Sequence, residues 1–215
     1  MKIMLHLAVC AASLMLFSGC AATQAHIGPS YQPQQNVQRL NGAEKVAVNV
    51  TMSDERQIQS CVGKKMNGYG MEMAPIIATN DVVELTRQAI ETELAHRGFA
   101  VVNTNAVNVM GELHRFYNEF RVGFWSGDAI AEVTVNIVVK NADGAILYTK
   151  LINGQGVEPS IQLASGNNAC LALNAALKDA TQRLFGHQSF TEALLKTSGS
   201  AETNHAAVTV PSSPK

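Results

Sequence analysis

Three long stretches of alternating apolar and polar residues follow one another in the second half of the chain, and they constrain the fold more than any other feature. These stretches cover residues 107–125, 129–141 and 145–157. A period of two with many β-branched side chains is typical of β-strands. Asp143-Gly144 separates the last two stretches and favours a tight hairpin turn, because both residues tolerate positive φ angles. The second half of the chain therefore predicts antiparallel hairpins.

Two other stretches have a helical period. Residues 80–98 place Val83, Ile90 and Leu94 on one face, and Gly98 is a typical residue after the end of a helix. Residues 167–185 repeat this pattern, and a short helical piece is expected over 189–195. Further strands are predicted at 45–52, 71–79 and 99–102, with a loop at 63–70.

These elements predict a single α+β domain over residues 44–196, in the order β-β-α-β-β-β-β-α. We expect a mainly antiparallel sheet with the two main helices packed on one face. Residues 20–43 are rich in Gln, Asn, Pro and Gly and predict a flexible tether. Residues 197–215, rich in Ser, Thr, Ala and Pro, predict a disordered tail.

Residues 1–19 predict a secretory signal peptide. Lys2 is their only charged side chain, and the apolar stretch of about 15 residues would form a helix of roughly 22 Å, short of the ~30 Å hydrocarbon core of a bilayer. Small residues then lead directly into a cysteine at Ser18-Gly19-Cys20. This ending resembles the bacterial lipobox, although Phe17 stands where leucine is usual.

The lipobox resemblance implies that Cys20 is acylated, palmitate included, and becomes the first residue of the mature protein. Ala21 follows it instead of the aspartate that tends to retain lipoproteins at the inner membrane, which implies the periplasmic face of the outer membrane. Several acyl chains provide stable attachment. The alternative is an ordinary signal peptide that happens to precede a cysteine.

A family resemblance adds to this interpretation. The run from Asn80 to Val101, preceded by Val62-Gly63-Lys64-Lys65 and Gly68-Tyr69-Gly70, resembles the YajG-type lipoproteins of Gram-negative bacteria. The similarity covers most of residues 45–196 together with the lipobox. It implies no biochemical activity and no functional residue other than Cys20.

The sequence assigns no catalytic residue, cofactor or metal ligand. No two histidines stand three or four residues apart, and no nucleophile-elbow or Walker-type motif is present. The formal charge of −1 gives no basic excess for nucleic acid. Glu119 and Glu132 are expected on neighbouring strands, where pairs of surface carboxylates are common.

The aromatic stretch of residues 116–125 provides a candidate binding face. Alternation places Tyr117, Arg121 and the single tryptophan, Trp125, on the side of the strand opposite Phe116 and Phe120. Tyr, Trp and Arg are enriched at binding hot spots. The alternative is a sheet whose outer face simply carries aromatic residues.

Four cysteines suggest one disulfide. Cys10 leaves with the signal peptide and Cys20 is acylated, so Cys61 and Cys170 remain and can pair in an oxidising periplasm. The alternative is two separately buried thiols.

Together these observations predict a non-enzymatic outer-membrane lipoprotein. Its periplasmic domain would be a binding or accessory module that contacts an envelope protein or a glycan such as peptidoglycan. Two alternatives remain: an enzyme of cell-wall turnover, and an accessory subunit of an envelope transport or surface-appendage assembly.

Overall fold

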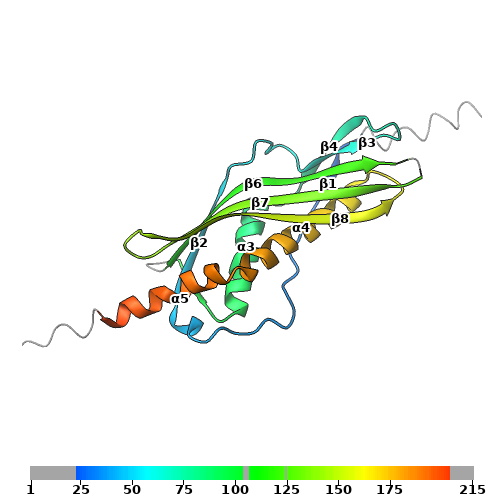
Figure 1. Ribbon diagram of the computed structural model, residues 1–215. Helices are drawn as coiled ribbons and strands as arrows, with labels where there is room; N and C mark the ends of the chain where they lie inside the picture. Colours follow the sequence, from blue (N-terminus) through cyan, green and yellow to red (C-terminus); the bar gives the residue numbers. More distant parts are fainter. Residues whose placement is uncertain (1–22, 104–106, 124, 204–215) are drawn as a thin grey trace, which may run out of the picture.

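The computed structural model describes residues 23–103, 107–123 and 125–203 and contains one large mixed sheet with helices against it (Figure 1). The signal peptide and Cys20 lie outside these residues. In chain order the elements are β1 (Ala25–Ile27), the 3₁₀ helix η1 (Ala43–Lys45), β2 (Ala47–Asp54), β3 (Gly63–Met66), β4 (Glu72–Ala78), α3 (Val82–His96), β5 (Ala100–Val101), β6 (Val107–Val122), β7 (Gly127–Lys140), β8 (Ile146–Ile161), α4 (Gly166–Gly186) and α5 (Gln188–Thr203).

The α+β class and the antiparallel hairpins of the second half are confirmed. Strand β7 pairs antiparallel with β6 on one side and with β8 on the other, along almost the whole length of each strand. The register places Tyr117 beside Glu132, and Glu132 beside Gln155. These three long strands form the body of the sheet (Figure 1).

The sheet as a whole is mixed: the predicted antiparallel pairing holds for β6, β7 and β8 and for β3 with β4, but the other pairs are parallel. Strand β2 runs parallel to β5 and β6, β3 runs parallel to β6, and β1 runs parallel to β4. Helix α3 connects β4 to β5, which lies at the far end of the strand order β1-β4-β3-β6-β2-β5.

The predicted order of elements was also incomplete. Strand β1 lies in the expected tether and β3 in the expected loop, while a third helix, α5, follows α4. Helix α5 continues to Thr203 and so includes the beginning of the expected disordered tail.

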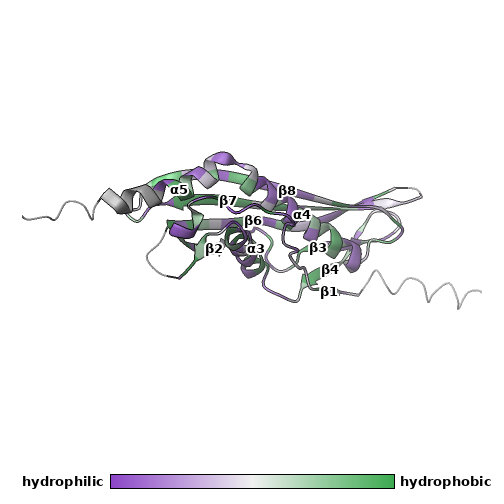
Figure 2. Ribbon diagram, turned by 90° about the horizontal axis from the view of Figure 1, so that it is seen from below, coloured by the Kyte–Doolittle hydropathy of each residue, from purple (hydrophilic) through white to green (hydrophobic). Residues whose placement is uncertain are grey.

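The helices pack on one face of the sheet. The residues of β7 that point toward them are at most 3% exposed: Ala129, Ala131, Val133, Val135, Ile137 and Val139. Figure 2 shows both apolar and polar residues along the helices, as expected of elements with one side on the core. Among the described residues, no helix covers the other face of β6, β7 and β8 (Figure 1), and we call this side the open face.

Two glycines allow α4 to lie unusually close to β8. A Cβ atom on Gly154 or Gly156 would overlap backbone atoms of α4 at Ala172, Ala176 or Ala180. The small residues of both elements therefore bring the helix backbone directly against the strand.

The N-terminal segment is ordered from Ala25 onward, which corrects the prediction of a flexible tether up to residue 43. After β1, the chain crosses the helices, where Tyr31 and Leu40 pack against the core. The phenolic hydroxyl of Tyr31 donates to Glu93 of α3 over 2.6 Å, and the hydroxyl of Thr181 on α4 donates to Tyr31 over 3.2 Å. Polar composition suggested flexibility, but these specific contacts hold the segment.

Candidate functional site

The predicted binding residues do not form one site. Tyr117 is partly buried on the open face of β6, while Arg121 is exposed near the end of that strand. Trp125 lies beyond the strand in the turn to β7 and is 85% exposed. The predicted opposite side is confirmed, because Phe116 and Phe120 are 1% and 5% exposed in the core.

Tyr117 lines a hollow on the open face, which we call the sheet-face hollow. It has a volume of about 310 Å³. The loop after β2 and the middle of β6 surround it, together with one residue of β7: Glu55, Arg56, Gln57, Ile58, His114, Arg115, Phe116, Tyr117 and Thr134.

Arg115 is the charged centre of the sheet-face hollow. Its guanidinium binds Glu119 on the same strand over 2.5 Å and Glu132 on β7 over 2.9 Å. The same guanidinium lies 5.4 Å from the ring centroid of Tyr117, a cation–π contact. Burial raises the pKa of the Tyr117 hydroxyl, so this group remains a hydrogen-bond donor at neutral pH.

A second arginine fixes the opposite wall of the sheet-face hollow. Arg56 binds the carboxylate of Asp54 through two nitrogens, each over 2.8 Å, and its side chain is only 8% exposed. The backbone N–H of Glu55 donates to the carbonyl of Leu113 over 2.9 Å, which attaches the loop to β6. Both arginines are therefore held in place by carboxylates.

The acidic residues of this region are bound within the sheet. Glu119 and Glu132 lie on neighbouring strands, as predicted, and both contact Arg115. Glu112 accepts a hydrogen bond from the Asn136 amide over 3.0 Å. Among the residues that the structure describes, no group of three or more His, Cys, Asp or Glu residues is arranged to hold a metal ion.

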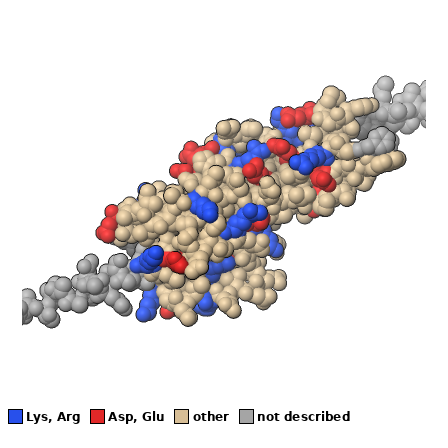
Figure 3. All heavy atoms as spheres, in the orientation of Figure 1, with Lys and Arg blue, Asp and Glu red and all other residues tan. Residues whose placement is uncertain are grey.

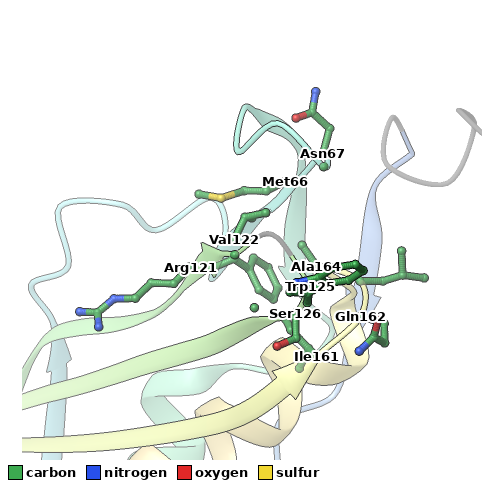
Figure 4. Close-up of a pocket in the computed structure, with 14 residues that line it drawn as sticks. Met66, Asn67, Arg121, Val122, Trp125, Ser126, Ile161, Gln162 and Ala164 are labelled. Atoms are coloured by element: carbon green, nitrogen blue, oxygen red, sulfur yellow. The ribbon is translucent and has the colours of Figure 1, made fainter.

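Trp125 and Arg121 line a second hollow of about 200 Å³, where three connections meet at one end of the sheet. We call this end the tip. It consists of the β3–β4 turn, the β6–β7 turn and the β8–α4 connection. Figure 4 shows Trp125 beside Ala164 and Gln162, whereas the side chain of Arg121 extends away from them.

The predicted disulfide is absent, because Cys61 and Cys170 are free thiols. Cys61 is buried directly before β3. Cys170 lies in α4, where it is partly buried and packs against the core.

A buried charged cluster, not predicted from the sequence, attaches α3 to the N-terminal segment. The Glu93 side chain is fully buried and accepts hydrogen bonds from the Tyr31 hydroxyl, from the Gln34 backbone N–H over 2.8 Å, and from Arg97. Burial alone would raise the pKa of Glu93, but these hydrogen bonds outweigh burial and lower it. Arg97 also lies 4.1 Å from the ring centroid of Phe185 on α4. The only sequence signal was a glutamate on the apolar side of a predicted helix.

The chain belongs to a family of lipoproteins. A family model described as uncharacterized lipoprotein, the YajG family, matches residues 33–195, which confirms the resemblance seen in the sequence. Membership in this family makes the chain a membrane-anchored protein of the cell envelope. No helix within the described residues is long and apolar enough to cross a bilayer.

Solved structures show distant similarity. Protein XCC0632 from Xanthomonas campestris is 12% identical with a TM-score of 0.49, and the alignment covers 85% of this chain and 99% of that one. A minor lipoprotein from Acinetobacter baumannii is 7% identical with a TM-score of 0.42, over 69% of this chain and 95% of that one. Among curated proteins, none matches the chain significantly.

Proposed function

We propose that this chain is an outer-membrane lipoprotein, anchored through Cys20, whose periplasmic domain binds another envelope protein without catalysing a reaction. The anchor is supported by the lipobox-like Ser18-Gly19-Cys20 and by family membership. The outer membrane is favoured because Ala21, not aspartate, follows the cysteine.

The open face is the observation that carries the binding proposal. The three α-helices of the described residues pack on the other side. Their buried residues share one core with the inward residues of β7, and Phe190 of α5 packs against the inward Tyr148 of β8 with ring centroids 5.4 Å apart. The open face thus leaves three long strands available to a partner.

The side chains of the open face fit a protein surface. Met110, Leu151 and Val157 are 41%, 53% and 52% exposed. Figure 3 shows Lys, Arg, Asp and Glu side chains of both signs interspersed over the sheet. Apolar area with scattered charges and Tyr and Arg residues is typical of interfaces between separately folded proteins.

The binding interpretation is also favoured over a cell-wall enzyme. A carboxylate that acts as a general acid or base must be able to reach the reacting proton. Glu119 and Glu132 are instead both engaged by Arg115. Their arrangement supports a role in fixing the sheet-face hollow.

Site-specific crosslinking in cells tests the binding face. A photo-crosslinking residue at Leu151 on the open face should form an adduct with another protein. The same photo-crosslinking residue in place of Leu171, a leucine of similar exposure on α4, should form much less of this adduct. Equal adducts at both positions, or a Leu151 adduct with peptidoglycan in place of protein, would contradict the proposed partner class.

Acyl labelling tests the anchor separately. Cys20→Ala should abolish incorporation of labelled palmitate and release the protein from the membrane fraction. Persisting label or unchanged fractionation would exclude Cys20 as the anchor.

A further inference from the structure

The tip exposes the most accessible large apolar side chains of the described residues. Tyr69 in the β3–β4 turn is 92% exposed, Trp125 in the β6–β7 turn 85%, and Leu163 in the β8–α4 connection 73%. Met71, after Tyr69, is 57% exposed. Solvent exposure of this apolar area is unfavourable, and its concentration at one end of the molecule indicates a docking surface.

The turns of the tip carry no charged side chain, although Arg121 lines their hollow and Lys65, Glu72 and Asp128 stand next to them in the chain. Residues 66–71, 122–127 and 161–171 contain no Asp, Glu, Lys or Arg. Figure 3 shows uncharged surface at the outermost part of this end, with charged side chains of both signs behind it. A surface without charges can leave water at low cost.

The register of β1 directs its first residue toward this tip. Ala25 pairs with Ile76 and Ile27 with Ala78, so β1 runs parallel to β4. Strand β4 begins at Glu72, directly after the turn that carries Tyr69 and Met71. The start of β1 therefore faces the end of the domain that carries the tip.

A second contact places the start of β1 beside the tip. A Cβ atom built on Gly166 would lie only 2.8 Å from the Cβ of Ala25, so β1 starts against the first residue of α4, close after Leu163. Three peptide units join Cys20 to Thr23, the first described residue, and they span at most about 11 Å. Cys20 is thus confined to this end of the domain.

We infer that the tip rests in the interface of the membrane that holds the lipid on Cys20. This inference depends on the proposed anchor. Trp and Tyr side chains favour the boundary between lipid headgroups and hydrocarbon, because one end of each is apolar and the other forms hydrogen bonds. The acyl chains bring the tip to the bilayer, and the tip then fixes the orientation of the domain, with the three long strands directed away from the membrane.

Trp125 provides the probe, because it is the only tryptophan of the chain. The lipidated full-length mature protein is reconstituted into protein-free vesicles of phosphatidylethanolamine and phosphatidylglycerol. The reference is the Cys20→Ala protein, measured without vesicles or detergent. Relative to this reference, we expect the Trp125 emission of the lipidated protein in vesicles to shift to shorter wavelength. Lipids brominated in the upper acyl chain should quench it.

A pair of leucine variants isolates the tip. Leu163→Ser should weaken the partition of the tip into the bilayer about tenfold and reduce the quenching, because one large apolar contact is lost. Leu151→Ser removes a leucine of the open face and should leave the quenching unchanged. Far-ultraviolet circular dichroism of both variants checks that the fold is intact.

Flotation of the vesicles separates the two proposals. Protein that floats with the vesicles but shows no quenching retains its anchor and overturns the inference about the tip. Protein that does not float overturns the anchor and the tip together. A blue shift that requires added envelope proteins and not lipid would assign the tip to a protein partner and also overturn the inference.

Discussion

The phenolic oxygen of Tyr31 lies 2.6 Å from the carboxylate of Glu93, although 62 positions separate the two residues in the chain. This hydrogen bond joins the N-terminal segment to α3, at a point where the Glu93 side chain is fully buried. The segment that connects the domain to the membrane anchor is therefore part of the folded domain. The contribution of this hydrogen bond to the stability of the domain can be tested with variants that remove one of its partner groups.

Tyr31→Phe should lower the free energy of unfolding by about 1.5–3 kcal/mol, the range for a hydrogen bond to a charged group. The variant keeps the ring and removes the hydroxyl, which donates to Glu93 and accepts a hydrogen bond from Thr181. Urea unfolding at neutral pH measures the change. Tyr69→Phe is the matched control: because that side chain is 92% exposed, its effect should stay within about 0.5 kcal/mol. Equal effects of the two variants would contradict the buried contact.

Glu93 should make the domain sensitive to acid. Its pKa is lower in the folded state than in the unfolded chain, so its contribution to stability is present above about pH 4.3 and is lost as the pH falls through the folded-state value. At pH 7, Glu93→Gln should cost about 3–5 kcal/mol, because Arg97 then stays buried without its counter-charge.

The difference between wild type and Glu93→Gln should narrow as the pH falls below about 4.3, because the unfolded wild-type chain then binds a proton at Glu93 before the folded protein does. Urea unfolding of both proteins at pH 7 and pH 3.5 measures this difference in the free energy of unfolding. Glu72→Gln, which removes an exposed carboxylate paired with Lys64, should cost at most about 1 kcal/mol. A Glu93→Gln deficit of the same size at both pH values would show that the carboxylate charge is not responsible.

Gly156→Ala should destabilise the domain by about 1–3 kcal/mol, because the new methyl group meets backbone atoms of α4 that can move only with the helix. Thermal unfolding followed by circular dichroism measures the shift of the midpoint. Gly186→Ala is the control, since a Cβ atom there meets nothing within 4 Å. If both variants unfold at the wild-type temperature, α4 does not lie as close to β8 as described.

The sequence predicted the elements whose signals are local. Strands β6, β7 and β8 follow from alternation over 14 to 16 residues and from Asp143-Gly144, and α3 and α4 follow from their helical period. The patterns of these elements depend only on near neighbours in the chain. The short strands β1 and β3, of three and four residues, contain too few positions to show alternation.

The candidate binding residues show a different limit of the sequence. Tyr117 and Arg121 alternate on β6, but this strand ends at Val122 and Trp125 lies in the turn beyond it. Tyr117 therefore lines the sheet-face hollow, whereas Arg121 and Trp125 line the hollow at the tip. The cysteine count had the same weakness, because it could not show how Cys61 and Cys170 are placed relative to each other.

The three antiparallel strands, the two long helices and the lipoprotein family of this chain could be predicted from its sequence. Three other features appear only in the folded protein: the parallel pairing of β1 with β4, the burial of Glu93 against Tyr31, and the meeting of the turns with Tyr69, Trp125 and Leu163 beside the start of β1. Each of these features is a contact between segments far apart in the chain. Its free energy depends on how the whole sheet and its helices pack, which no local pattern of residues records.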